Sequence, residues 1–221
     1  MGQRPVRSHF PYPFVRYDDA VVTVSTAAIS RIKDAWVLIR PRFTAYELVL
    51  PGDPSFVCRA SHCEAHCCRV FSVALGDREV ERLATTEHRA PVTFLESEDG
   101  EPIRLPLLQP FLLSRTDGHC SLLGTEELCG AYEGRPDACR LYPHFVIAID
   151  EETNRPVHGD PDAIEAAVRF ALDDTAPRSP LAPLLLRHLE CPGFEGPPLQ
   201  EPHWRTLLVE TFKLQYRPGS S

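Results

Sequence analysis

The distribution of apolar residues predicts three regions of β-strand. Residues 14–25 and 36–50 are rich in β-branched and aromatic side chains, which favours strands. Pro41 interrupts the second region, so we expect that strand at a sheet edge or at a bulge. Residues 144–150, HFVIAID, show the clearest strand pattern. Residues 90–118 contain four prolines and predict a covering loop with one short strand.

Apolar residues at helical spacing predict four helices. A short helix is expected over 76–89, with acidic residues in its first part. The clearest helix covers 161–174, where Asp160 can cap the first turn and apolar residues recur four apart. Further helices are expected over 183–189 and 201–214. Because these helices and strands are short and show no repeat, they predict a single compact α+β domain.

Composition excludes several classes of protein. The chain has 221 residues, 43% of them hydrophobic, which is enough for a sizeable core. Its net charge of −8 argues against a nucleic-acid partner. No apolar run approaches the length of a membrane span, so we expect no membrane partner. The N-terminal residues lack a continuous apolar segment, so a cytoplasmic location is expected.

Eight cysteines are the unusual feature of the composition, and they occur in groups. Four lie within residues 58–68 (CRASHCEAHCC), and the others occupy polar, turn-rich contexts; the eight are Cys58, Cys63, Cys67, Cys68, Cys120, Cys129, Cys139 and Cys191. In a reducing compartment such a set indicates metal binding rather than disulfides. Four thiolates make a structural zinc site or hold a cubane iron–sulfur cluster, so eight suffice for two sites or for one with spare thiols.

Any one of these cysteines alone is better explained as a small buried hydrophobic side chain. A tight group of four, with four more mostly beside glycines and charges, favours metal binding over that alternative. Side chains of adjacent residues usually point apart, so we expect Cys67 and Cys68 to serve different metals, or only one of them to be a ligand. His62 and His66 lie inside the first group, but eight thiolates already supply enough ligands without them.

The motifs around these cysteines resemble the CxxCxxCC cysteine-cluster family, which includes YkgJ-like zinc- or iron-chelating proteins. The resemblance rests on CRASHCEAHCCRVF, GHCSLL, CGAYEGRPDACRLYP and ECPGF, and the third of these is the most specific. It extends from about Phe56 to Cys191. The spacing departs from the family in one respect: four residues separate Cys58 from Cys63 and three separate Cys63 from Cys67, where the family usually has two.

The resemblance implies a bacterial metal-binding protein. The cysteine cluster is also distantly similar to that of flagellin lysine methylases, which are described as iron–sulfur proteins. On that similarity a [4Fe-4S] cluster is the first choice of cofactor and zinc the second, since thiolate sites accept either. A metal ion or cluster is therefore the expected partner, and a protein or peptide substrate is a second candidate partner.

Polar residues beside the cysteines are candidates for supporting the thiolates. A four-thiolate metal site carries negative charge, and burying that charge requires hydrogen-bond donors and positive charge nearby. Arg135 and Arg140 supply both, and Tyr132 can donate a hydrogen bond. The alternatives are that the arginines serve a turn or the surface and that Tyr132 only packs.

These observations predict a domain of short elements organised around a cysteine-ligated metal centre. We expect a β-rich N-terminal segment at 1–50, a metal-binding core at 51–195, and a C-terminal helix with a frayed tail at 196–221. The predicted function is metal binding. The alternatives are an iron–sulfur-dependent, methylase-like enzyme that modifies a protein or peptide, and a metal carrier or sensor. No motif for a nucleotide cofactor is present, so catalytic residues are not assigned.

Overall fold

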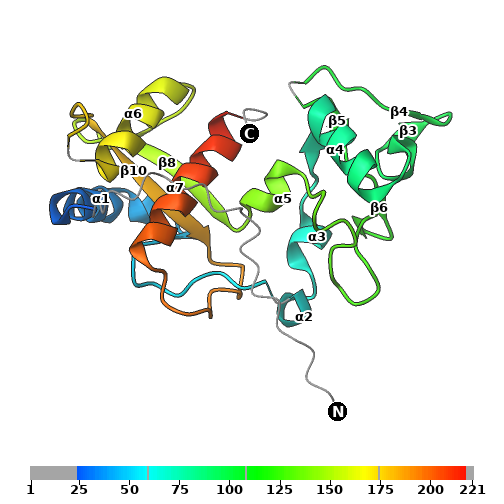
Figure 1. Cartoon of the computed structure of the whole chain (residues 1–221), viewed down its shortest axis with the longest axis horizontal. Coiled ribbons are helices and arrows are strands. Elements are labelled where there is room, and N and C mark those ends of the chain that lie inside the picture. Colours follow the sequence, from blue (N-terminus) through cyan, green and yellow to red (C-terminus); the bar gives the residue numbers. More distant parts are fainter. Residues whose placement is uncertain (1–23, 59, 108, 174, 218–221) are drawn as a thin grey trace, which may run out of the picture.

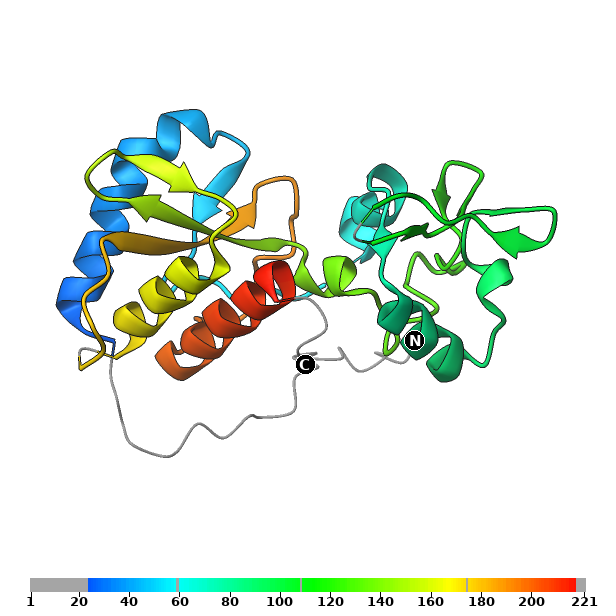
Figure 2. The same cartoon turned by 90° about the horizontal axis from the view of Figure 1, so that it is seen from above.

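The computed structural model describes residues 24–58, 60–107, 109–173 and 175–217. Helices and antiparallel strands alternate along the chain, and together they form one α+β domain, as predicted. Two lobes are visible within it (Figures 1 and 2). The sheet lobe consists of residues 24–57 and 143–217, and the insert lobe consists of residues 60–142. The insert lobe therefore interrupts the sheet lobe in sequence.

The sheet lobe is built on a four-stranded antiparallel sheet in the order β1-β10-β8-β9. Helices α6 and α7 lie side by side in Figure 2, and α1 packs against β10. Trp204 of α7 is fully buried and donates a hydrogen bond to the carbonyl of Val49 at 2.8 Å. The elements are α1 (Thr26–Ile39), η1 (Arg40–Arg42), β1 (Tyr46–Leu48), β8 (His144–Asp150), β9 (Arg155–Val157), α6 (Pro161–Leu172), β10 (Leu181–His188) and α7 (Glu201–Tyr216).

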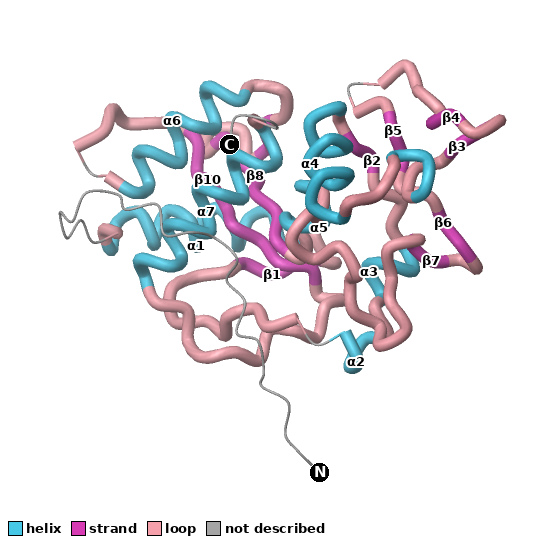
Figure 3. Tube along the Cα trace, turned by 45° about the vertical axis from the view of Figure 1, so that its right-hand side comes forward, coloured by secondary structure: helices cyan, strands magenta, loops and turns pink. Residues whose placement is uncertain are grey.

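The insert lobe consists of short helices and two-residue strands around a second, smaller hydrophobic cluster. Figure 3 shows these strands apart from the central sheet. The last helix of the lobe, α5, packs against α7 and joins the two lobes. The elements are α2 (Ala60–Cys63), α3 (His66–Val70), β2 (Ala74–Leu75), α4 (Asp77–Glu87), η2 (Pro91–Thr93), β3 (Ser97–Glu98), β4 (Glu101–Pro102), β5 (Phe111–Leu112), β6 (Arg115–Thr116), β7 (His119–Cys120) and α5 (Asp137–Leu141).

The structure confirms the helices predicted over 76–89, 161–174 and 201–214, and also the strand at 144–150. Asp160 caps α6 as expected, since its side chain accepts a hydrogen bond from the backbone N–H of Ala163 at 2.9 Å. The covering loop at 90–118 contains several short strands rather than one.

The strand predicted over 36–50 is wrong for most of its length. Residues 26–39 form α1, and only Tyr46–Leu48 are in a strand. Val37 and Leu38, two of the residues that favoured a strand, lie on the exposed side of α1. The strand predicted over 14–25 lies outside the described residues except for its last two positions, and so does most of the predicted C-terminal tail.

The helix predicted over 183–189 is also wrong, because this segment forms β10. A proline in a central strand is unusual, since proline donates no ladder hydrogen bond. The register accommodates it, because Pro183 pairs with Ala148 of β8 in a position without ladder hydrogen bonds. The N–H of Glu151 bonds to the carbonyl of Pro180, and hydrogen-bonded pairs alternate along an antiparallel ladder, so Pro183 directs its nitrogen away from β8. On that side β1 has already ended, because it reaches only Leu186.

Candidate metal centre

The eight cysteines come from three separate segments of the chain and lie at the junction of the lobes. Cys58 precedes α2, Cys63 ends α2, and α3 carries Cys67 and Cys68. Cys120 lies in β7, Cys129 lies in the loop that follows it, Cys139 lies in α5, and Cys191 follows β10. All eight are within the described residues, and none of them forms a disulfide. Fold and sequence therefore agree that these are thiols.

Four of the thiols form an inner group, Cys68, Cys120, Cys129 and Cys139. Burial raises the pKa of Cys120 and of Cys129, and the charges of neighbouring cysteines raise both further. Burial raises the pKa of Cys139 to about 12, with added contributions from Cys129, Cys120 and Cys67. The charges of Cys120 and Cys129 also act on Cys68. Effects of this kind require the thiols to lie near one another.

The remaining thiols form an outer group, Cys58, Cys63, Cys67 and Cys191. Burial raises the pKa of Cys191 to about 11, and the charges of Cys63, Cys58 and Cys67 add to the shift. Tyr142 lies beside this group: burial raises the pKa of its hydroxyl, and Cys191, Cys67 and Cys63 raise it further. The outer group thus joins the start of the insert lobe to the end of β10.

The dipeptide Cys67–Cys68 connects the two groups. Its sulfur atoms are 4.0 Å apart, so the side chains do not diverge as expected of adjacent residues. A hydrogen bond from the Cys68 thiol lowers the pKa of Cys67 to about 6 and raises that of Cys68. Two thiolates on one tetrahedral zinc are about 3.8 Å apart, given Zn–S bonds of ~2.3 Å. The separation therefore suits two ligands of one ion or of two adjacent ions.

The donor atoms of both groups are thiol sulfurs, which suit a soft or borderline metal. Thiolates bind zinc and iron–sulfur clusters strongly, and both groups contain four of them. Among the described residues, however, no three side chains of His, Cys, Asp or Glu converge closely enough to hold an ion as they stand. Ligation would therefore require the thiols to come closer together than they are here.

A backbone ribbon explains why Cys191 lies near Cys58. Residues 52–57 and 193–199 run antiparallel and exchange hydrogen bonds, including Val57 N–H to the Gly193 carbonyl at 2.7 Å. Gly196 donates to the Ser55 carbonyl at 3.0 Å and sits directly against that residue. The close approach of the two segments leaves no room for a side chain at position 196.

Replacing Gly196 with alanine is expected to destabilise the protein by about 1–3 kcal/mol, the usual effect of overpacking. The added Cβ would lie 2.4 Å from the Ser55 Oγ and 2.9 Å from the Ser55 carbonyl oxygen. Thermal melts with metal analysis will measure the effect. Gly100→Ala is the control for glycine replacement as such, because a Cβ there meets no atom within 4 Å, although its positive φ adds some strain. Equal melting temperatures for Gly196→Ala and the unmodified protein would contradict the predicted packing.

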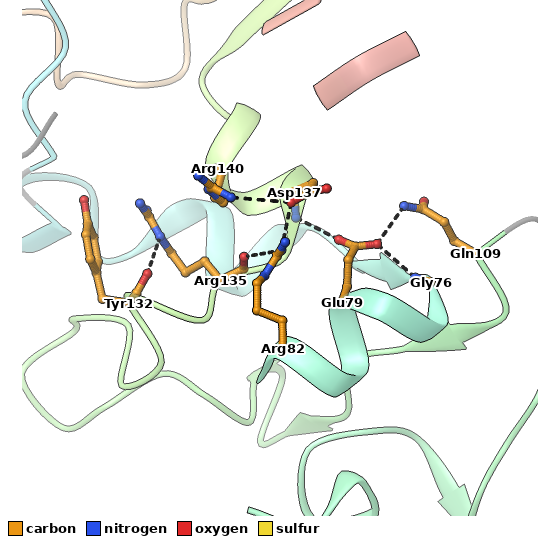
Figure 4. A network of polar contacts seen from close by, with 8 residues as sticks. All are labelled: Gly76, Glu79, Arg82, Gln109, Tyr132, Arg135, Asp137 and Arg140. Carbon is orange, nitrogen blue, oxygen red and sulfur yellow. Dashed lines mark hydrogen bonds and ion pairs between the residues drawn. The ribbon is translucent and has the colours of Figure 1, made fainter. Parts of the chain in front are cut away.

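Ionic contacts and hydrogen bonds attach the CGAYEGRPDACRLYP motif, which contains Cys129 and Cys139, to α4 (Figure 4). The backbone N–H of Asp137 donates to the buried Glu79 carboxylate at 2.8 Å. The Asp137 carboxylate accepts from Arg82 at 2.8 Å and lies 3.8 Å from the Arg140 guanidinium. Arg82 also donates to the carbonyl of Arg135 at 2.9 Å. These contacts fix α5, and with it Cys139, against the core of the insert lobe.

Arg135 lies close to the inner thiols. Its positive charge lowers the pKa of Cys129 and of Cys139, in opposition to the larger effect of burial. Its Nε donates to the carbonyl of Tyr132 at 3.0 Å, and its guanidinium stacks 3.7 Å from the centroid of the Tyr132 ring. Burial raises the pKa of Tyr132, and the charge of Cys58 contributes. The arginine and the tyrosine thus lie between the two groups.

The histidines are more exposed than the thiols. His62 and His66 pair with Glu195 at 3.7 Å and Glu190 at 3.3 Å, and both histidine side chains are at least 36% exposed. These contacts keep both histidine side chains at the surface. Sequence reasoning did not identify Glu79, Arg82 and Asp137 as important, because charged residues on or near a short helix carry no distinctive signal.

Part of the chain matches a known protein family. Residues 57–159 match the family model CxxCxxCC, which carries the description "Putative zinc- or iron-chelating domain". The matched segment spans somewhat less than half of the chain. The match to the CxxCxxCC domain confirms the resemblance seen in the motifs and supports zinc or iron chelation as the function of this region. It includes seven of the eight cysteines, and Cys191 lies beyond it.

No curated protein and no solved structure matches the chain. The similarity to flagellin lysine methylases stays a prediction. Within the described residues, no helix combines the length and the apolar composition needed to cross a bilayer.

Proposed function

We propose that this protein holds metal through all eight cysteines, in two neighbouring four-thiolate sites. The inner site consists of Cys68, Cys120, Cys129 and Cys139, and the outer site of Cys58, Cys63, Cys67 and Cys191. The observation that carries the proposal is the proximity of thiols from three distant segments. Burial is the main cause of the raised pKa values of Cys120, Cys129, Cys139 and Cys191, and the charges of neighbouring cysteines add to each of them.

The central dipeptide lies between the two sites. The charge of Cys67 contributes to the raised pKa values of Cys120, Cys129, Cys139 and Cys191, and the charges of Cys120 and Cys129 contribute to that of Cys68. We assign Cys67 to the outer site because this completes two sets of four thiolates. Arg135 and Arg140 supply positive charge beside the inner site, and Arg135 and Tyr132 supply hydrogen-bond donors.

Iron–sulfur is our first choice for the metal, on the similarity of the cysteine cluster to that of flagellin lysine methylases. Protein purified without oxygen is expected to be brown and to contain acid-labile sulfide with iron. Metal and sulfide analysis with a visible spectrum tests this. Colourless protein with two zinc ions per chain and no sulfide would contradict the iron–sulfur choice and support zinc.

Zinc is the second candidate because of the 4.0 Å between the sulfur atoms of Cys67 and Cys68. In a cubane each iron takes one cysteine, which keeps ligand sulfurs further apart than two ligands of one zinc. Comparing Cys191→Ser with Cys139→Ser tests the two-site arrangement with either metal. Each variant is expected to lose one of the two sites, and full loss or full retention of metal in both would contradict it.

A further inference from the structure

Three buried polar side chains of the sheet lobe have no hydrogen-bond partner among the described residues. Ser55, His144 and Thr211 are only 5%, 8% and 3% exposed, and no hydrogen bond joins their side chains to another described residue. The other buried polar residues do form such bonds. The fully buried side-chain atoms without a partner among the described residues are Arg82 Nε and one Nη of Arg187, so the polar atoms of Ser55, His144 and Thr211 reach a space that water can enter.

All three residues line the same cavity. It has a volume of about 50 Å³ and lies where α5 of the insert lobe meets the sheet lobe. A water molecule needs about 10–15 Å³ of such a cavity, so there is space for a few waters or for a molecule of about five non-hydrogen atoms. The unpartnered side chains therefore converge on a space of molecular size.

The charge around the cavity favours an anion. Arg135 and Arg140 both line it, and no aspartate or glutamate does. Burial, together with the charge of Arg187, lowers the pKa of His144 to about 3, so the ring is neutral at pH 7 and offers one N–H donor. Two arginines with hydroxyl and imidazole donors match a carboxylate, which accepts several hydrogen bonds in a plane.

Aromatic rings form another part of the wall. Phe56 and Phe194 line the cavity and contact the His144 ring edge-on, with centroids 6.0 and 5.5 Å away. Such a wall accepts a short alkyl group beside the polar donors. We propose that this cavity binds a small monocarboxylate, with the carboxylate toward the arginines and the alkyl group against the phenylalanines.

The site is distinct from the cysteine groups but adjacent to them. Tyr142 lines the cavity and also lies beside the outer group, whose charges raise the pKa of its hydroxyl. A bound carboxylate would therefore lie next to the metal centre without being one of its thiolate ligands.

Isothermal titration of the full-length, metal-loaded protein with acetate and propionate tests the proposal. Saturable binding at one site per chain is expected, with acetate at least tenfold tighter than acetamide, which has the same shape without the charge. Sodium chloride at equal ionic strength controls for unspecific salt effects. Equal affinities for acetate and acetamide, or no saturation, would overturn the proposal.

Thr211→Val removes one donor with almost no change of shape and is expected to weaken acetate binding about tenfold while metal content stays constant. Thr206→Val, on the same helix, is the matched control, because the Thr206 hydroxyl bonds to the Pro202 carbonyl instead. Unchanged affinity in Thr211→Val overturns the assignment. Loss of affinity together with loss of metal also overturns it, because the carboxylate would then be a metal ligand.

If Thr211→Val does not fold, the unmodified protein provides the test. Intermolecular NOEs from the methyl group of ¹³C-labelled acetate to aromatic protons of Phe56 or Phe194 are then expected. Saturable binding without NOEs to these rings would place the ligand elsewhere and reject the cavity.

Discussion

Replacing Cys139 with serine is expected to unfold the insert lobe while the sheet lobe keeps its structure. The hydrophobic cluster of the insert lobe contains eight buried residues among those described, against 24 in the sheet lobe. So small a cluster leaves most of the stability to the metal. A structural metal site contributes about 10–16 kcal/mol of apparent binding free energy, and this becomes folding energy because the site does not exist in the unfolded chain.

Hydrogen exchange followed by mass spectrometry will locate this effect. Peptides from 60–142 are expected to lose protection in Cys139→Ser and after chelation of the metal, whereas peptides from β8 and β10 keep it. His62→Ala and His66→Ala are the controls, and each is expected to change stability by less than about 0.5 kcal/mol because these side chains make only surface pairs. Unchanged metal content and unchanged protection in Cys139→Ser would show that the motif around Cys129 and Cys139 is not part of the metal site.

Replacing Asp137 with alanine is expected to destabilise the protein by about 3 kcal/mol and to reduce its metal content. The carboxylate is 6% exposed and lies between the guanidinium groups of Arg82 and Arg140, which would be left facing each other. Asp77→Ala is the matched control, since Asp77 also pairs with an arginine of the same lobe, Arg104, but in solvent. An ion pair in solvent contributes little to stability. Urea titrations giving equal effects for both variants would contradict the role assigned to Asp137.

The elements with regular apolar spacing could be predicted from the sequence, and two others could not. In α1 the buried residues Ala28, Ile32, Trp36 and Ile39 do follow helical spacing, but the β-branched and aromatic character of 36–50 outweighed that signal. In β10 the signal itself was misleading. Pro183 is acceptable there only because β1, which pairs with the other edge of β10, is short. The length of β1 depends on the tertiary fold and cannot be inferred from the residues of β10.

The eight cysteines could be selected from the sequence as candidate ligands, but their arrangement in space could not. Motif spacing indicated all eight thiols, and the short sulfur–sulfur separation of Cys67 and Cys68 depends on the local backbone of α3. The approach of Cys191 to Cys58 depends on a ribbon between residues more than a hundred positions apart. Only Gly193 and Gly196 indicate that ribbon in the sequence, and glycine also has many other uses.

The pairing of β8 with β10 has a consequence for how correctly folded molecules are selected. β8 begins shortly after Cys139 and β10 ends shortly before Cys191, with His144 opposite Arg187. Residues 181–186 are all buried, so a slip of two residues would keep apolar side chains on both faces and cost little in burial. The same slip would displace Cys191 by about 7 Å, whereas metal ligands tolerate about 0.2 Å. Only molecules whose central strands are paired in the correct register would then retain metal, so metal binding would select correctly aligned strands.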